Sequence, residues 1–406
     1  MGSTLSRRLA PVATSVACAG LFLGSFGDEA AQVSFALRLA DGSQAAPAQV
    51  SALLAAGLLG GISAGFVAPR VIVQLGARRV IGAVLITEAV LIAAASLANT
   101  LYWYLAVAAA LGCLGSMLWA AVMVTLPALS TTDAGVDRAN RVVQSVRNLG
   151  YVVGPVLGSA LFAWSAGANG LLALAALMFL SAVCVAFSLP RLVDVGVGKE
   201  TKPDGNHAAD VRGLLRTEGV TRAVTPLLIT VLVTSALNVL LIVRVRNELG
   251  FNAEMYGVIV AALSVGLVVG PILIAGFAGR LGEAAGASAA AAAIGLGIII
   301  VGSAQLAWQL VVAATCIGIA NGVQNALMAG YMIKRIDPTR RAFQMPAYIM
   351  IIQITVFLGF IGAAFIRVDQ AGAALVTVGT VAVLVGLLGA LLNLSNRPQP
   401  SREGGR

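Results

Sequence analysis

Twelve runs of apolar residues divide this 406-residue chain, and most are long enough to cross a bilayer as a helix. A spanning helix needs about 20 apolar residues, because each residue advances the helix by about 1.5 Å. The chain is 59% hydrophobic and only 11% charged, which is too apolar for a soluble domain. We therefore predict an all-α membrane protein with twelve transmembrane helices. The runs lie at 11–39, 49–73, 80–98, 102–129, 142–166, 170–189, 224–246, 255–279, 286–304, 306–333, 343–366 and 371–394.

A hydrophilic stretch between the sixth and seventh runs divides the chain into two halves of six runs. The predicted parts are a six-helix bundle at 1–190, a cytoplasmic central loop at 191–222, a second six-helix bundle at 223–395 and a cytoplasmic tail at 396–406.

Short motifs recur at corresponding places in the two halves. GFVAPRVIVQLGARR (65–79) ends the second run, and GPILIAGFAGRLG (270–282) ends the eighth. DRANR (137–141) and DPTRR (337–341) precede the fifth and eleventh runs. These echoes suggest an internal duplication and two pseudo-symmetric bundles. In transporters built from such repeats, the substrate site lies near the middle of the membrane, where the repeats meet.

The net charge of +9 is distributed in a way that indicates membrane topology. Of the 26 Lys and Arg residues, 20 fall at the termini, in the central loop or in the loops of one side, and Arg70 and Arg147 lie near the same side at the edges of runs. Only Arg38, Arg244, Arg246 and Arg367 fall on the other side. Because positive residues concentrate on the cytoplasmic side, we predict a multi-pass protein of the cell (plasma or inner) membrane with both termini cytoplasmic. This distribution accounts for the basic charge without nucleic-acid binding.

Residues that serve catalysis are scarce. The four cysteines lie in separate apolar runs without metal-ligand spacing, and the single histidine, His207, lies in the hydrophilic stretch. No G-x-x-x-x-G-K-[ST] stretch is present, which argues against a nucleotide-driven pump. We expect no enzyme, no metal site and no cofactor.

A polar stripe crosses the first run, because Ser25, Asp28, Glu29 and Gln32 follow one another at helical spacing. A carboxylate in the membrane costs about 2.5 to 3.5 kcal/mol on insertion scales, so it needs a wet cavity, a partner or a proton. Asp28 is our first candidate for a proton-coupling group, and Glu29 is the second. The alternatives are hydrogen bonds between helices, or a stripe close enough to the outer surface to be hydrated.

Glu88 is the third proton-coupling candidate. It lies midway along the third run, which contains no basic residue near it. Two interpretations stay open at this stage: an ion pair with Arg147, or a protonated side chain packed against a neighbouring helix.

Amide, aromatic and thioether side chains follow helical faces of the fourth and tenth runs, and weaker polar lines follow the first and seventh. Such side chains around an apolar cavity can hold varied organic molecules. The alternative is hydrogen bonding between helices. The candidate substrate-cavity residues are Gln32, Ser116, Trp119, Met123, Asn238, Asn321, Gln324, Asn325 and Met328.

Glycines at four-residue spacing mark the fifth run, where Gly150, Gly154 and Gly158 accompany Pro155. This pattern predicts a close approach to another helix and a local kink.

Four segments give the chain a resemblance to the major facilitator superfamily, and within it to drug-efflux branches that include macrolide-efflux-like and siderophore-exporter-like proteins. The segments are GSFGDEAAQ (24–32), the signature at 65–79, GYVVGPVLG (150–158) and LVVGPILIAG (267–276). The resemblance implies that spans one, four, seven and ten line the cavity, and that the glycine element of span five is associated with export.

The same resemblance gives Arg78 and Arg79 a structural role as the basic end of the signature after span two. The chain departs from the family pattern there, because Val73 and Gln74 stand where an acidic residue and an arginine are expected. Ser159 also replaces the last glycine of the span-five element.

These features together predict a proton-coupled exporter of amphiphilic organic compounds that works by alternating access. Its expected partners are a small organic substrate, protons and the lipid bilayer, with no nucleic acid, and we expect it to act as a monomer. The alternatives are a proton-coupled uptake carrier for a small organic nutrient and a transport-inactive membrane scaffold or sensor.

Overall fold

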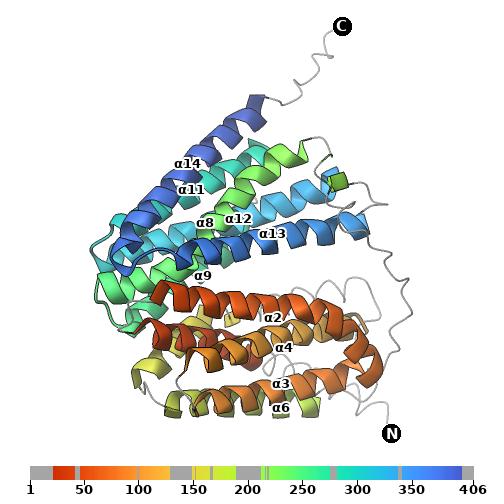
Figure 1. Ribbon diagram of the computed structural model, residues 1–406. Coiled ribbons are helices and arrows are strands. Elements are labelled where there is room, and N and C mark those ends of the chain that lie inside the picture. Colours follow the sequence, from red (N-terminus) through yellow and green to blue (C-terminus); the bar gives the residue numbers. More distant parts are fainter. Residues whose placement is uncertain are drawn as a thin grey trace. The chain divides into compact units, whose positions relative to one another are not determined.

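The computed structural model is helical throughout the part of the chain that it describes (Figure 1). The described residues are 22–41, 46–97, 100–128, 149–150, 152–164, 168–188, 212–214, 216, 219–274, 281–336 and 341–395.

Within the described residues, twelve helices lie in the twelve predicted apolar runs, and they confirm the predicted fold class. They are a first helix at 22–40, α2 (Ala46–Leu75), α3 (Ala77–Ala95), α4 (Leu101–Ala128), a fifth helix (Val152–Trp164), α6 (Ala168–Ser188), α8 (Val220–Val243), α9 (Ala253–Ile274), α11 (Glu283–Ser303), α12 (Ala307–Arg335), α13 (Arg341–Ala364) and α14 (Ala371–Ser395). Within the described residues, eight spans are long and apolar enough to cross a membrane. A π-helix, η2 (Arg244–Glu248), continues α8, and a short 3-10 helix, η3 (Val368–Gln370), precedes α14.

The chain forms two compact units. Unit 1 contains Met1–Lys202, Leu241–Ser264 and Phe360–Asp369. Unit 2 contains Pro203–Leu240, Val265–Gly359 and Gln370–Arg406. The predicted boundary at residue 190 lies outside the described residues, so the predicted domain limits stay a prediction.

Small residues let the helices of unit 1 pack closely. α2 lies along α4, and α3 lies beside α4 and α6 (Figure 1). Gly57 and Gly60 of α2 meet the backbone of α4 at Gly112 and Ala109. Helices in a membrane gain their association from such packing, because the surrounding lipid is as apolar as their side chains.

The first helix lies against the glycines of the fifth helix in the same way. A Cβ atom added to Gly158 would lie 2.5 Å from the carbonyl oxygen of Ala30, and one added to Gly154 would lie 3.0 Å from that of Phe26. The Ser34 hydroxyl donates a hydrogen bond of 3.1 Å to the carbonyl oxygen of Gly158. These contacts fix the rotation of the first helix, and with it the direction of its polar stripe.

Unit 2 uses glycine in the same way on other helices. α11 packs along α14 and also against α12. A Cβ atom added to Gly379 of α14 would lie 2.8 Å from the carbonyl oxygen of Gly295, and one added to Gly302 would lie 2.6 Å from that of Gly372. A backbone approach this close leaves no room for a side chain.

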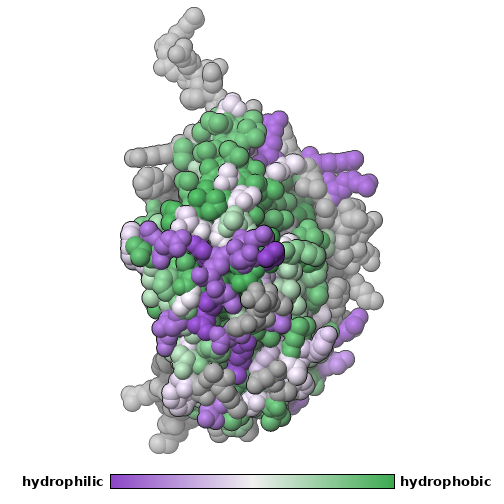
Figure 2. Space-filling view, turned by 60° about the vertical axis from the view of Figure 1, so that its left-hand side comes forward, coloured by the Kyte–Doolittle hydropathy of each residue, from purple (hydrophilic) through white to green (hydrophobic). Residues whose placement is uncertain are grey.

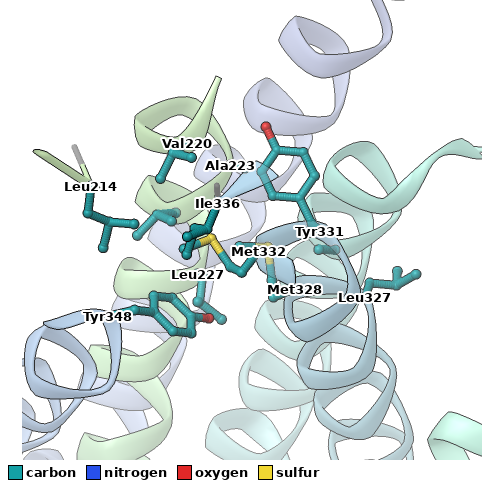
Figure 3. Packing of buried hydrophobic residues seen from close by; sticks show 12 residues of the cluster. Leu214, Val220, Ala223, Leu227, Leu327, Met328, Tyr331, Met332, Ile336 and Tyr348 are labelled. Atoms are coloured by element: carbon teal, nitrogen blue, oxygen red, sulfur yellow. The ribbon is translucent and has the colours of Figure 1, made fainter. Parts of the chain in front are cut away.

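A hydrophobic cluster holds one end of unit 2 together (Figure 3). Met328 and Met332 of α12 lie at its centre, with no exposed surface. Leu214, from the described end of the central loop, is also fully buried in the cluster. The loop is therefore anchored to unit 2 by a buried leucine.

Apolar side chains also cover much of the outer surface (Figure 2). On α14 alone, Leu384, Leu388 and Leu391 are each more than half exposed. Unpartnered apolar surface of this extent suits a lipid surrounding.

Candidate transport site

The polar stripe of the first helix runs from the interior of unit 1 to its surface. Ser25 is buried at 6% exposure, Asp28 and Glu29 are half-buried, and Gln32 is exposed. Because these residues occupy one helical face, groups along a single line differ in their access to water.

Asp28 and Glu88 meet in the interior of unit 1. Glu88, on α3, has 0% exposure, and neither of its carboxylate oxygens has a hydrogen-bond partner among the described residues. Asp28 Oδ1 is likewise buried without a partner there. Both side chains point toward Gly115 of α4, where an added Cβ atom would lie 2.8 Å from Asp28 Oδ2 and 3.9 Å from Glu88 Oε1. Arg147, the partner considered for Glu88, lies outside the described residues.

Glu29 faces different neighbours from Asp28, although the two are adjacent in sequence. Its Cβ atom lies against Gly154, and its charge acts on Tyr256 of α9, which is 7% exposed. Successive residues on a helix point about 100° apart, so one acid lies toward α3 and α4 while the other lies toward the fifth helix and α9.

On α4, the predicted cavity residues Ser116 and Trp119 are exposed and half-buried, respectively. The Ser116 hydroxyl lies beside Gly61 of α2, 3.0 Å from the position that a Cβ atom would take. The side chain of Met123 lies outside the described residues. α4 therefore contributes one polar and one aromatic group to the surface of unit 1.

The predicted cavity residues of unit 2 separate into a buried pair and a surface group. Gln324 is 1% exposed, and its Nε2 donates to Thr230 Oγ1 at 3.4 Å and to the carbonyl oxygen of Ala287 at 3.3 Å. Met328 belongs to the buried hydrophobic cluster. These contacts are those of residues that pack helices together.

The surface group of unit 2 consists of amides. Asn325 is exposed, and its Nδ2 donates to Asn321 Oδ1 at 3.1 Å. Asn321 is half-buried, and Asn238 of α8 is exposed. These three amides have exposed surface in unit 2, whereas Gln324 has almost none.

A second polar cluster in unit 1 lies where α8 passes into η2. Arg246 Nη2 donates to Asp41 Oδ1 at 2.6 Å, and Asn247 Nδ2 donates to the carbonyl oxygen of Ala40 at 3.0 Å. Arg244 pairs with Glu248 at 2.5 Å within η2. This cluster was not predicted from the sequence, where the one signal for it is the pair of arginines on the side that has few positive residues.

The segment after α2 and its counterpart after α9 share a backbone feature. Gly76 precedes α3 at φ 82°, and Gly282 precedes α11 at φ 75°. This left-handed region favours glycine. Arg78 is half-buried and Arg79 is exposed.

Among the described residues, no group of three or more His, Cys, Asp or Glu side chains could hold a metal ion.

Comparison with known families places the chain in a class of membrane transporters. Residues 17–359 match the family model described as Major Facilitator Superfamily. The chain therefore belongs to the major facilitator superfamily, which confirms that part of the predicted resemblance. A search of curated protein sequences finds no match.

Solved structures of transporters share the fold. The nucleoside transporter NupG is 14% identical with a TM-score of 0.70, over 94% of this chain and 100% of that one. A mutant of the peptide transporter POT in complex with alafosfalin is 15% identical with a TM-score of 0.70, over 92% and 93% of the two chains. A bacterial metal transporter is 14% identical with a TM-score of 0.68, over 95% and 99%. At these identities the likeness concerns the fold alone.

Proposed function

We propose that this protein is a proton-coupled exporter of amphiphilic organic compounds that works by alternating access. The observation that carries the proposal is the meeting of Asp28 and Glu88 inside unit 1, with buried oxygens that lack partners among the described residues. A carboxylate in such a place is stable when it binds a proton, and releasing that proton to one side of the membrane can drive transport.

Asp28 is the group that we propose to exchange the proton. Asp28 is half-buried and has some exposed surface, whereas Glu88 has none. Glu29 is the second choice, because it lies against Gly154 and near Tyr256, away from Gly115.

The substrate contacts that we propose are adaptable rather than charged. Ser116 and Trp119 of unit 1 and Asn238, Asn321 and Asn325 of unit 2 have accessible polar or aromatic surface. Such groups suit an amphiphilic compound that is held by area burial and a few hydrogen bonds.

Export is proposed from the resemblance of the fifth helix to the element associated with export, at Gly150, Gly154, Pro155 and Gly158. We also propose that the protein lies in the cell membrane as a monomer with both termini in the cytoplasm, in agreement with the distribution of Lys and Arg.

The alternative is a proton-coupled uptake carrier for a small organic nutrient. A nucleoside transporter and a peptide transporter share this fold, so the fold is compatible with polar organic substrates. A scaffold or sensor without transport is the third possibility.

One experiment distinguishes export from uptake, and from a scaffold or sensor, which would give neither resistance nor transport. Expression in a host that lacks its own exporters should raise resistance to some amphiphilic compounds, and these compounds then serve as substrates for purified protein in vesicles. We expect accumulation only when a pH gradient is imposed, and loss of accumulation when an ionophore collapses the gradient. Gradient-driven movement in the opposite direction would support uptake, and movement indifferent to the gradient would refute proton coupling.

A further inference from the structure

Glu88 is a buried acid without a polar partner in the described part of the chain. It lies near the middle of α3 with no exposed surface, and both of its oxygens lack hydrogen-bond partners among the described residues. The ion pairs within those residues involve other side chains. Because a charge that is buried without compensation is strongly unfavourable, Glu88 requires a proton or a cation.

Asp28 is the polar group that reaches toward Glu88. Asp28 Oδ2 and Glu88 Oε1 approach the same point beside Gly115, at 2.8 Å and 3.9 Å. The two oxygens are therefore at most 6.7 Å apart, the sum of these distances. A small side-chain rotation or one bridging water would join them. Since α4 has no side chain at Gly115, nothing from α4 separates the two acids.

The surroundings of the pair offer no positive charge among the described contacts. α6 places Met178 against Gly27 and Ser181 near Gly24, and α3 places Leu85 against Gly24. Glu29 is a further acid whose charge acts on Asp28. These neighbours are neutral or negative, which favours a proton over a second negative charge.

We propose that Asp28 and Glu88 form one proton-binding site, in which the two side chains share a single proton beside Gly115. The proton forms an O–H bond on Glu88, this O–H donates to Asp28, and the charge of the pair falls from two negative charges to one. Asp28 exchanges the proton with water, because it is the half-buried partner. The role of the site in transport rests on the proposed function.

A shared site has a distinct signature. Two nearby acids lose their protons in two steps that belong to the pair, and these steps are separated because the first charge opposes the second. Independent acids would each keep their own step when the other is removed.

The test is an infrared titration of the purified protein, which follows the carbonyl stretch of protonated carboxylic acids against pH. The double variant Asp28→Asn/Glu88→Gln supplies the background, and protons are the only ligand used. We expect two steps in the wild type. In Glu88→Gln and in Asp28→Asn, the remaining acid should lose its proton about one pH unit or more below the upper wild-type step, because the like charge is gone.

Gly115→Ala keeps both acids and tests their approach. The added Cβ atom displaces the end of the Asp28 side chain and weakens its interaction with Glu88. The pH interval between the two steps should therefore become smaller. Gly82→Ala is the control, because a Cβ atom on this α3 glycine meets nothing within 4 Å and both steps should stay. Gly115→Ala also keeps the proposal testable if Glu88→Gln does not fold.

The shared site would be overturned if each remaining acid kept its wild-type step in Glu88→Gln and in Asp28→Asn, and if both steps kept their positions in Gly115→Ala. That result would leave proton-coupled export intact if vesicle transport still follows the pH gradient. Conversely, coupled steps in a protein whose transport ignores the gradient would support the site and refute the proposed function.

Discussion

The two units differ in the kind of polar group that they hold and in how well that group is satisfied. Unit 1 buries the carboxylates of Asp28 and Glu88, with oxygens that lack partners among the described residues. Unit 2 buries the amide of Gln324, which donates to two oxygens, and keeps Asn325 at its surface. A buried carboxylate without a partner suggests a site that binds and releases a proton. A buried amide with both hydrogen bonds made suggests a role in helix packing. We propose that protons are bound in unit 1 and that the exposed amides of unit 2 contact substrate.

Packing does not explain this difference, because both units use the same device. Gly158 meets the first helix in unit 1, and Gly379 meets Gly295 in unit 2, each at backbone contact distance. Gly76 and Gly282 begin α3 and α11 with similar positive φ angles. The two halves thus share a scaffold, and the polar residues placed on it differ.

The largest loss of function should follow from disrupting the packing between the first and the fifth helix, which sets the orientation of the polar stripe. Gly154→Leu would push the new side chain into Glu29 and the backbone at Phe26 and Ala30, so we expect loss of folded protein or of all transport. Gly65→Leu is a matched control, because a Cβ atom there meets nothing within 4 Å. Expression and monodispersity in detergent measure the outcome, and wild-type behaviour of Gly154→Leu would remove the packing argument.

A smaller effect is expected at the satisfied amide of unit 2. Gln324→Leu removes two hydrogen bonds, each worth about 0.6 kcal/mol between membrane helices, so stability should fall by about 1 kcal/mol. The pH dependence of transport should stay unchanged. Thermal unfolding and vesicle transport measure the two properties. A changed pH dependence would assign Gln324 to the proton site and break the comparison.

The ion pair of Arg246 and Asp41 should have a modest effect on stability. It ties the end of the first helix to η2 within unit 1. Arg246→Ala should lower the thermal stability only slightly, because partly exposed pairs are worth at most about 1 kcal/mol.

Lys334→Ala provides the comparison in unit 2, because it removes the pair between Glu283 and a lysine side chain that is 71% exposed. The loss of stability should be smaller than in Arg246→Ala, because a more exposed charge pair is worth less. Thermal unfolding measures both variants, and an equal or larger loss in Lys334→Ala would contradict this order.

The smallest effect concerns topology. Asn206→Cys should leave transport unchanged, because Asn206 lies in the hydrophilic stretch between the two halves. An impermeant thiol reagent should label it only from the cytoplasmic side. Labelling from outside in intact cells would reverse the assignment of both termini.

The fold could be predicted from the sequence because span length and helical spacing are local properties. The apolar runs predicted the helices, and the spacing of Ser25, Asp28, Glu29 and Gln32 predicted a polar stripe along the first helix. The spacing did not predict that Asp28 and Glu29 face different helices. The sequence could not show that Glu88 and Asp28 converge at Gly115, because that contact depends on how three helices rotate against one another. For the same reason, the spacing of Gln324 and Asn325 could not tell the buried amide from the exposed one.

The assignment of proton binding to unit 1 and of substrate contact to unit 2 is tested most directly by comparing Asp28→Asn with Asn325→Leu in the same vesicles. Asn keeps the size of the side chain at position 28 and fixes it neutral, so Asp28→Asn should exchange substrate across the membrane but fail to accumulate it against a gradient. Glu29→Gln, next in sequence, should retain at least part of the uphill transport. Asn325→Leu should keep uphill, gradient-driven transport with a KM raised about tenfold or less. If Asp28→Asn still accumulates substrate at the wild-type rate, the coupling role passes to Glu29 or Glu88, and the assignment of proton exchange to Asp28 is contradicted.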